Sequence, residues 1–191
     1  MEFRQPVSTP RRDLIRIAAV GAMAALCMAH TPYRQWAVYR QRHLLIVVNK
    51  RDAPSYELGK VVAAILAEYL PASSARVTRA PYVGRVGSLI ASKQLDVALL
   101  RPQQADALMR GRKPFTDYGP VALRAIAGLG EFLLVCRDDF LARHAYLLAQ
   151  TLSLHAGKIA VLAPNTTVPA HEGALAFFER DALPPTANDA Q

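Results

Sequence analysis

The stretch HLLIVVNKRDAPSYELGKVVAAILAEYL, residues 43–70, holds one strand-like run followed by one helix-like run. Residues 43–49 enclose a continuous apolar run, residues 44–48, that is rich in branched side chains, which is typical of a strand buried on both faces of a parallel sheet. Residues 50–55 predict a turn. Residues 56–70 carry apolar side chains at helical spacing, and Pro71 stops the helix. The stretch therefore predicts a strand–turn–helix unit at the start of a folded domain.

The same alternation of strand and helix continues along the chain. Residues 76–80 predict a short second strand, and residues 95–100 (LDVALL) predict a third, buried one. Helices are expected over residues 87–93 and 103–109. Because repeated strand–helix–strand units build parallel sheets with right-handed crossovers, we expect an α/β fold with an open, mostly parallel sheet and flanking helices.

The last third of the chain predicts the remaining elements. They are strands at residues 121–127, 131–137 and 158–162, and helices at residues 143–154 and 172–181. The tail, residues 183–191, is expected to be disordered. These boundaries place one domain at residues 43–182, preceded by a separate N-terminal segment.

The N-terminus has the parts of an export signal. Residues 8–29 place an arginine pair, Arg11 and Arg12, before a weakly hydrophobic, alanine-rich stretch. This pattern resembles the twin-arginine signal, which implies export to the periplasm by the twin-arginine translocase. Pro10 departs from the pattern, because a polar residue is usual before the pair. We expect the signal to occupy residues 1–29.

The signal could be cleaved or could stay as an anchor. The alternative to a signal is an ordinary cytosolic helix. Cleavage after Ala29 would release the domain, although no strong A-x-A site is present. An uncleaved anchor in the inner membrane is the alternative, but Ile17 to Ala29 is shorter than the ~20 residues that span a bilayer. Residues 30–42 mix Trp36 and tyrosines with arginines, which is expected of a linker or an interfacial helix.

Composition and charge narrow the classes of partner. The 191 residues are 52% hydrophobic and 20% charged, a globular composition, and carry a net charge of +8. Residues 1–29 hold four arginines and two acidic residues, so the rest of the chain carries +6. This mild excess favours anionic ligands or a membrane surface. No basic run with interleaved aromatics is present, so nucleic-acid binding is not expected.

No catalytic or metal-binding pattern stands out. Cys27 lies in the N-terminal apolar stretch and Cys136 in a strand-like run, so they suggest no disulfide framework. The five histidines lack ligand spacing: His30, His43, His144, His155 and His171. A Ser/His/Asp arrangement, paired carboxylates and a phosphate loop are all missing from the sequence. We therefore expect neither an enzyme nor a cofactor or metal.

Four segments together resemble a known family. They are VVNKRDAPSYELGKVVAAILAEYL (47–70), VGRVGSLIASKQLDVALLRPQQADALMRGRKPF (83–115), LRAIAGLGEFLLVCRDD (123–139) and HAGKIAVLAPNTT (155–167). In this order they are similar to type II periplasmic binding proteins, and within these to the TAXI-type solute-binding subunits of TRAP transporters. The resemblance covers about residues 43–180. It implies an exported solute-binding protein that works with TRAP membrane subunits.

In open α/β sheets, ligands sit beyond the carboxyl ends of the strands, where helix N-termini offer free N–H groups. The candidate side chains there are Asn49, Lys50, Arg51, Asp52 and Ser55 after the first strand, Tyr82, Arg85 and Ser88 after the second, and Arg101, Gln103 and Gln104 after the third. If Arg51, Arg85 and Arg101 converge, a small anionic solute is the natural ligand, because guanidinium groups bind carboxylates bidentately. Loop arginines are equally expected to be solvated.

Asn165 and Thr166 resemble the family's ligand loop in the second lobe, and they would serve equally as N-caps of the last helix. A full binding protein of this type has two lobes, whereas we expect here one lobe and the first strand and helix of a second. Such a chain could bind weakly, dimerise to supply a second wall, serve structure or sensing, or be a degenerate fragment. The alternative to a solute-binding protein is therefore a membrane-anchored accessory, sensor or assembly protein without a ligand.

Overall fold

The computed structural model describes residues 43–155, 157 and 159–184, which all belong to one unit of the chain. The predicted signal with Arg11 and Arg12, the predicted linker at residues 30–42 and most of the predicted tail lie outside the described residues. Among the helices that are described, none is long and apolar enough to cross a membrane.

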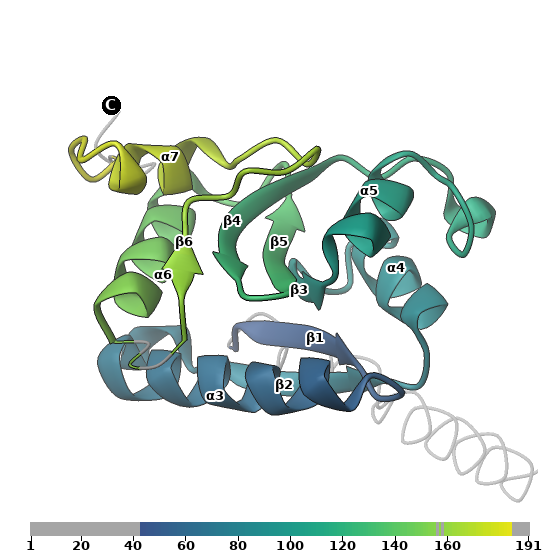
Figure 1. Ribbon diagram of the computed structural model, residues 1–191, viewed down its shortest axis with the longest axis horizontal. Helices are drawn as coiled ribbons and strands as arrows, with labels where there is room; N and C mark the ends of the chain where they lie inside the picture. The colour runs from purple at the N-terminus through teal and green to yellow at the C-terminus, as the bar shows by residue number, and fades with distance from the viewer. Residues whose placement is uncertain (1–42, 156, 158, 185–191) are drawn as a thin grey trace, which may run out of the picture. The chain divides into compact units, whose positions relative to one another are not determined.

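Six strands form one sheet in the order β2–β1–β3–β5–β4–β6, and helices cover both of its faces (Figure 1). The strands are β1 (Leu45–Asn49), β2 (Arg76–Ala80), β3 (Val97–Leu100), β4 (Leu123–Leu129), β5 (Phe132–Arg137) and β6 (Val161–Leu162). The α-helices are α3 (Ala53–Tyr69), α4 (Val83–Ala91), α5 (Pro102–Met109), α6 (Ala142–His155) and α7 (Glu172–Phe178). The predicted α/β class with flanking helices is confirmed.

Strand direction divides this sheet into two parts. β1 pairs in parallel with β2 and with β3, whereas β3–β5, β5–β4 and β4–β6 are antiparallel pairs. It follows that β1 to β4 point in one direction, and β5 and β6 in the other. The carboxyl ends of β1, β2, β3 and β4 therefore lie along the same edge, which we call the carboxyl edge.

Strand β1 lies inside the sheet and is buried on both faces. Ile46, Val47 and Val48 have no exposed surface. Ile46 and Val48 belong to the core cluster shared with α3 and α6, and Val47 belongs to the cluster shared with α4 and α5. This alternation follows from the two-residue period of a strand. It explains why the run is apolar throughout rather than at every second position.

Helix α3 begins earlier than the sequence predicted. It starts at Ala53, because Pro54 is compatible with the first helical turn, where its missing N–H is not needed. Ser55 is therefore a helical residue and not part of the turn. Further along, Gly59 lets the helix approach the sheet closely, since a Cβ there would lie 2.7 Å from Cγ1 of Val48.

The two glycine-separated runs in the second half form a β-hairpin. The chain reverses at Gly130, whose φ of 60° suits glycine, and β5 returns between β3 and β4. A bulge between Ala125 and Ala127 shifts the register of β4 against β5. The hairpin brings Glu131, at its turn, to the carboxyl edge.

The last strand and helix complete the same sheet, so the prediction that they start a second lobe is wrong. β6 pairs with β4, and α7 packs so tightly on α6 that a Cβ at Gly173 would overlap the carbonyl oxygen of Ala142. His171 caps α7: its Nδ1 accepts a hydrogen bond from Gly173 N (3.1 Å), and its Nε2 donates to Phe140 O (2.8 Å). This tautomer follows from the first of these bonds.

Replacement of Gly59 by alanine is expected to destabilise the domain. The added methyl group overpacks the contact with Val48, at a cost of about 1–3 kcal/mol, against a gain of roughly 1 kcal/mol in helix propensity. Urea unfolding measures the difference, with Ala64→Ser on the exposed face of α3 as the control. Adding Val48→Ala should make the double variant more stable than the sum of the single effects predicts. A Gly59→Ala protein more stable than the wild type, or a double variant with no coupling to Val48→Ala, would contradict this packing.

Candidate functional site

The point at which the chain changes the direction in which it adds strands to the sheet lies between β1 and β3. The chain leaves β1 for β2 on one side and returns to β3 on the other. In open α/β sheets, this crevice at the carboxyl edge is where ligands bind. Residues 50–52 connect β1 to α3, and Arg101 connects β3 to α5. The loop after β1, the start of α5 and the turn of the β4–β5 hairpin meet at this edge.

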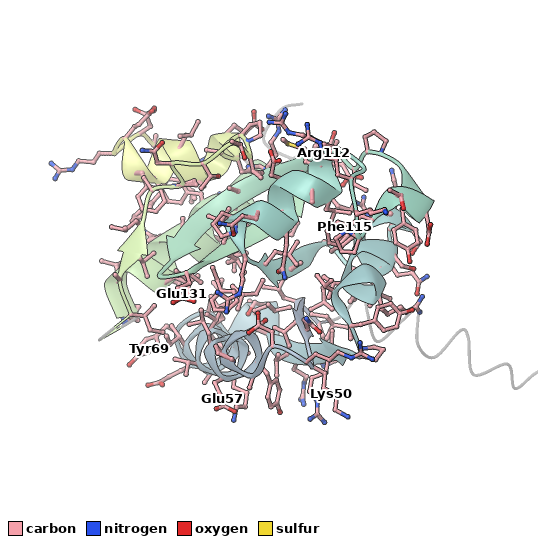
Figure 2. All side chains as sticks on the ribbon, turned by 45° about the vertical axis from the view of Figure 1, so that its right-hand side comes forward. Lys50, Glu57, Tyr69, Arg112, Phe115 and Glu131 are labelled. Carbon is pink, nitrogen blue, oxygen red and sulfur yellow. The ribbon has the colours of Figure 1, made fainter. Side chains whose placement is uncertain are left out.

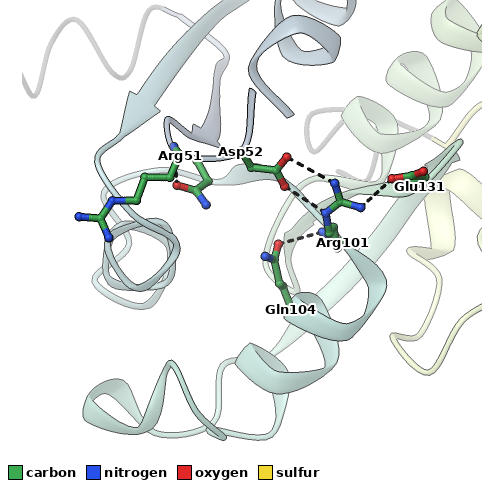
Figure 3. Close-up of polar contacts among 6 residues, drawn as sticks. Arg51, Asp52, Arg101, Gln104 and Glu131 are labelled. Atoms are coloured by element: carbon green, nitrogen blue, oxygen red, sulfur yellow. Dashed lines mark hydrogen bonds and ion pairs between the residues drawn. The ribbon is translucent and has the colours of Figure 1, made fainter. Parts of the chain in front are cut away.

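Arg101 holds these three segments together through two carboxylates (Figure 3). Its Nε donates to Oδ2 of Asp52 (3.1 Å) and its Nη2 to Oδ1 of the same residue (3.4 Å). Its Nη1 donates to Oε2 of Glu131 (2.6 Å), and the guanidinium lies 4.7 Å from the ring centroid of Phe132. The hydrogen bonds that Arg101 donates to Asp52, and then the one to Glu131, hold the pKa of Arg101 above its ordinary value. This guanidinium is engaged within the protein and is not a free anion receptor.

The two carboxylates differ in exposure. The side chain of Asp52 is 15% exposed, whereas that of Glu131 is 75% exposed. The Asp52 contact is also bidentate, which makes it the better defined of the two. The backbone N–H of Arg101 donates to Oε1 of Gln104 (3.1 Å), so Gln104 serves the start of α5. Gln103, its neighbour, is exposed.

The condition for a shared arginine site, that Arg51, Arg85 and Arg101 converge, is not met by their side-chain positions. Figure 3 shows the side chain of Arg51 extending away from Arg101. Its guanidinium lies 5.9 Å from the ring centroid of Tyr82. On α4, Arg85 Nη1 donates to Oγ of Ser88 (3.1 Å). Each guanidinium has its own protein partner.

The loop after β1 presents two cations. Lys50 donates its backbone N–H to Ala80 O (2.8 Å), and Asn49 Oδ1 accepts from the backbone N–H of Arg51 (3.1 Å). These bonds fix the turn, and the side chains of Lys50 and Arg51 are exposed. Asn49 therefore shapes the loop, while the two basic residues carry its positive charge.

The N-terminus of α3 lacks a side-chain cap. Asp52 occupies the N-cap position, but its carboxylate binds Arg101 and makes no hydrogen bond to the helix. Ser55, in the first turn, is 1% exposed, and its Oγ has no hydrogen-bond partner. A buried polar group without a partner costs about 1–3 kcal/mol. This unpaired hydroxyl lies at a helix end that favours negative charge. The sequence alone gives no sign that Ser55 is buried and unpaired.

Asn165 and Thr166 lie elsewhere. Both precede α7 by several residues, and His171 caps that helix, so their predicted N-cap role is wrong. Thr166 Oγ1 donates to Val168 O (3.3 Å). The side chain of Thr167 hydrogen-bonds Asp106 on α5, which lowers the pKa of that carboxyl. The loop therefore runs beside α5 rather than over the ends of β1 and β3.

Other reactive groups in the described residues show no site of their own. No group of three or more His, Cys, Asp or Glu is placed there to hold a metal ion. Cys136 is fully buried in β5, and this burial raises the pKa of its thiol well above the ordinary value. A buried thiol of this kind is a poor nucleophile, because the thiolate is the reactive form.

No family model matches the chain, and no curated protein matches it significantly. The resemblance to TAXI-type solute-binding subunits therefore stays a prediction.

The two ion pairs of Arg101 are expected to contribute unequally to the free energy of unfolding. Double-mutant cycles with Arg101→Gln, Asp52→Asn and Glu131→Gln, followed by urea unfolding, should give the larger coupling for Asp52. The reason is its lower exposure and bidentate contact, whereas an exposed pair is weakened by water and salt. Raising the salt concentration should reduce the Glu131 coupling proportionally more. Equal couplings at both carboxylates would contradict the geometry.

Proposed function

We propose that this protein is an exported, TAXI-like solute-binding protein that recognises a small anionic organic solute at the carboxyl edge. The observation that carries the proposal is the buried, unpaired hydroxyl of Ser55 in the first turn of an uncapped helix. Helix N-termini bind anions because their N–H groups and dipole favour negative charge. Lys50 and Arg51 add two exposed positive charges in the adjoining loop.

The residues of the site divide into binding and positioning roles. A carboxylate of the solute would accept hydrogen bonds from Ser55 Oγ and from the backbone N–H groups of Ala53 and Ser55, since Pro54 has no N–H and that of Tyr56 donates to Asp52 O (3.3 Å). Arg101 acts as a positioning residue, because it binds Asp52 and so keeps that carboxylate from capping the helix itself. Tyr82 supports Arg51 from the neighbouring loop. In transport, the loaded protein would deliver its solute to TRAP membrane subunits, and a second copy of the chain could supply the facing wall.

A second candidate is an anchored accessory, sensor or assembly protein without a ligand. It is favoured by the engagement of Arg101 with Asp52 and Glu131, which leaves a net negative charge on these three side chains. A negative centre opposes an anionic solute. The two candidates differ in one observable property, which is stabilisation of the domain by a solute.

A solute that binds is expected to raise the thermal unfolding temperature of the full-length protein. Succinate, glutamate and other organic and amino acids form the panel, and a ligand at 100 times its Kd stabilises by about 2.7 kcal/mol. Ser55→Ala should lower the affinity about fivefold through the lost hydrogen bond. The same change should leave the solute-free protein equally stable or more stable, because an unpaired hydroxyl is removed.

Two charge variants locate the site. Lys50→Gln should weaken binding, whereas Arg112→Gln removes the same charge at a distance, since the two residues lie on opposite sides of the view in Figure 2. If no panel member stabilises the protein, the accessory role is favoured instead. If Ser55→Ala lowers stability and leaves affinity unchanged, its hydroxyl is structural and the proposed site is wrong.

Export is expected to depend on the arginine pair. Changing Arg11 and Arg12 together to lysine should reduce the periplasmic fraction of the protein in a bacterial host, because the translocase recognises the pair itself. Arg16→Lys, outside the pair, is the matched control and should leave export unchanged. Undiminished periplasmic protein in the double variant would refute the twin-arginine assignment.

A further inference from the structure

A cavity of about 360 Å³ lies at the opposite edge of the sheet, among the amino ends of β1 and β3. Leu44 precedes β1, Asp96 precedes β3, and Phe140 follows β5, which runs the other way. Leu70, just after α3, and Leu147 of α6 add further apolar walls. A volume of this size is within the range of small-molecule sites. The cavity is separated from Ser55 by the length of α3.

The walls are apolar and the polar groups are few. Leu148 is 2% exposed and belongs to the main core cluster, so the cavity reaches down to the core. Ser73 is one of the lining residues, and its Oγ is buried beneath the cavity surface without a hydrogen-bond partner. The imidazoles of His43 and His144 also line it, and His144 lies edge-on to Phe140 with ring centroids 5.8 Å apart.

The charged side chains described at this edge form ion pairs with one another. Asp96 is the acidic residue of the lining, and its Oδ1 lies 3.3 Å from Nη1 of Arg137. Arg137 also binds Asp139, which in turn lies 3.5 Å from Lys93 Nζ. Among the described Asp, Lys and Arg side chains at this edge, a charged ligand would therefore meet no unmatched opposite charge, and it would lose its hydration without compensation. An uncharged ligand meets no such penalty.

We propose that this cavity binds a small uncharged molecule with an apolar body and one hydroxyl group. The apolar body, aromatic or branched, would fill the space among Leu70, Phe140 and Leu147. Its hydroxyl group would pair with Ser73 Oγ after the serine side chain rotates toward the cavity, which would satisfy the buried group that now lacks a partner. This site differs from the carboxyl-edge site both in its position and in the charge of its ligand.

Three probes of matched shape test the charge preference on the full-length protein. 2-Phenylethanol, phenylacetate and 2-phenylethylammonium share a phenyl ring and differ in the polar end. Isothermal titration calorimetry should give an affinity for the alcohol about tenfold or more above that of either ion, because a charge is costly to bury unpaired. Absence of binding by the alcohol, or tighter binding by an ion, would overturn the proposal.

Cavity variants then locate the binding. Ala72 lines the cavity and is exposed, so Ala72→Trp should block entry and remove binding without disturbing the core. Ala64→Trp, on an exposed position of α3 outside the lining, is the matched control and should bind normally. Retained affinity in Ala72→Trp would place the alcohol elsewhere and refute the site.

Ser73→Ala separates the contribution of the hydrogen bond to affinity from that of the apolar contacts. This test is independent of the Ala72→Trp variant. The affinity for 2-phenylethanol should fall about fivefold, whereas that for ethylbenzene, which has no hydroxyl group, should not change. Equal losses for both probes would refute the role of Ser73. Ser55→Ala should leave both affinities unchanged, so failure of the carboxyl-edge site and failure of this one are distinguished.

Discussion

Burial of β1 on both faces is the constraint on which the rest of the fold depends. Because β2 and β3 flank it and helices cover both faces, its four buried residues, Leu45 to Val48, are all apolar, and only Asn49 at its end is polar. The close contact between Gly59 and Val48 sets α3 directly against this strand. Since β1 ends at Asn49 and β3 at Leu100, the loops that follow them must lie together at one edge. The position of the carboxyl-edge site follows from this arrangement.

The two edges of the sheet differ because charged and apolar residues are distributed differently over its loops. At the carboxyl edge, loops from three strands bring Asp52, Arg101 and Glu131 into one network. This network fixes the loops and pairs the charge of Arg101, so the proposed anion binding would depend on the helix end and on Lys50 and Arg51. At the amino edge, apolar side chains border an open volume, and the nearby charges pair with one another. The edges therefore suit ligands of different charge.

The sequence predicts the strands well, because an apolar run of branched residues is a local signal: β2 has the predicted bounds and β1 lies within its predicted run. Helix starts are less predictable, because the first turns of α3 and α4 contain Pro54 and Gly84, which disfavour a helix interior, so the sequence predicts a turn at Ser55. The Arg101 network could not be predicted. Its partners are 49 and 30 positions away, and only the strand order brings them together.

The two unpaired hydroxyls, of Ser55 and Ser73, lie near opposite ends of helix α3. Ser55 lies in the first turn of α3 and Ser73 follows shortly after its end, so the 17-residue helix, about 25 Å long, connects both edges. Each unpaired hydroxyl costs about 1–3 kcal/mol in a domain whose total stability is on the order of 5–15 kcal/mol. A ligand at either edge would remove one of these costs. Because Gly59 holds α3 tightly against Val48, such a ligand would stabilise the folded domain rather than move the helix.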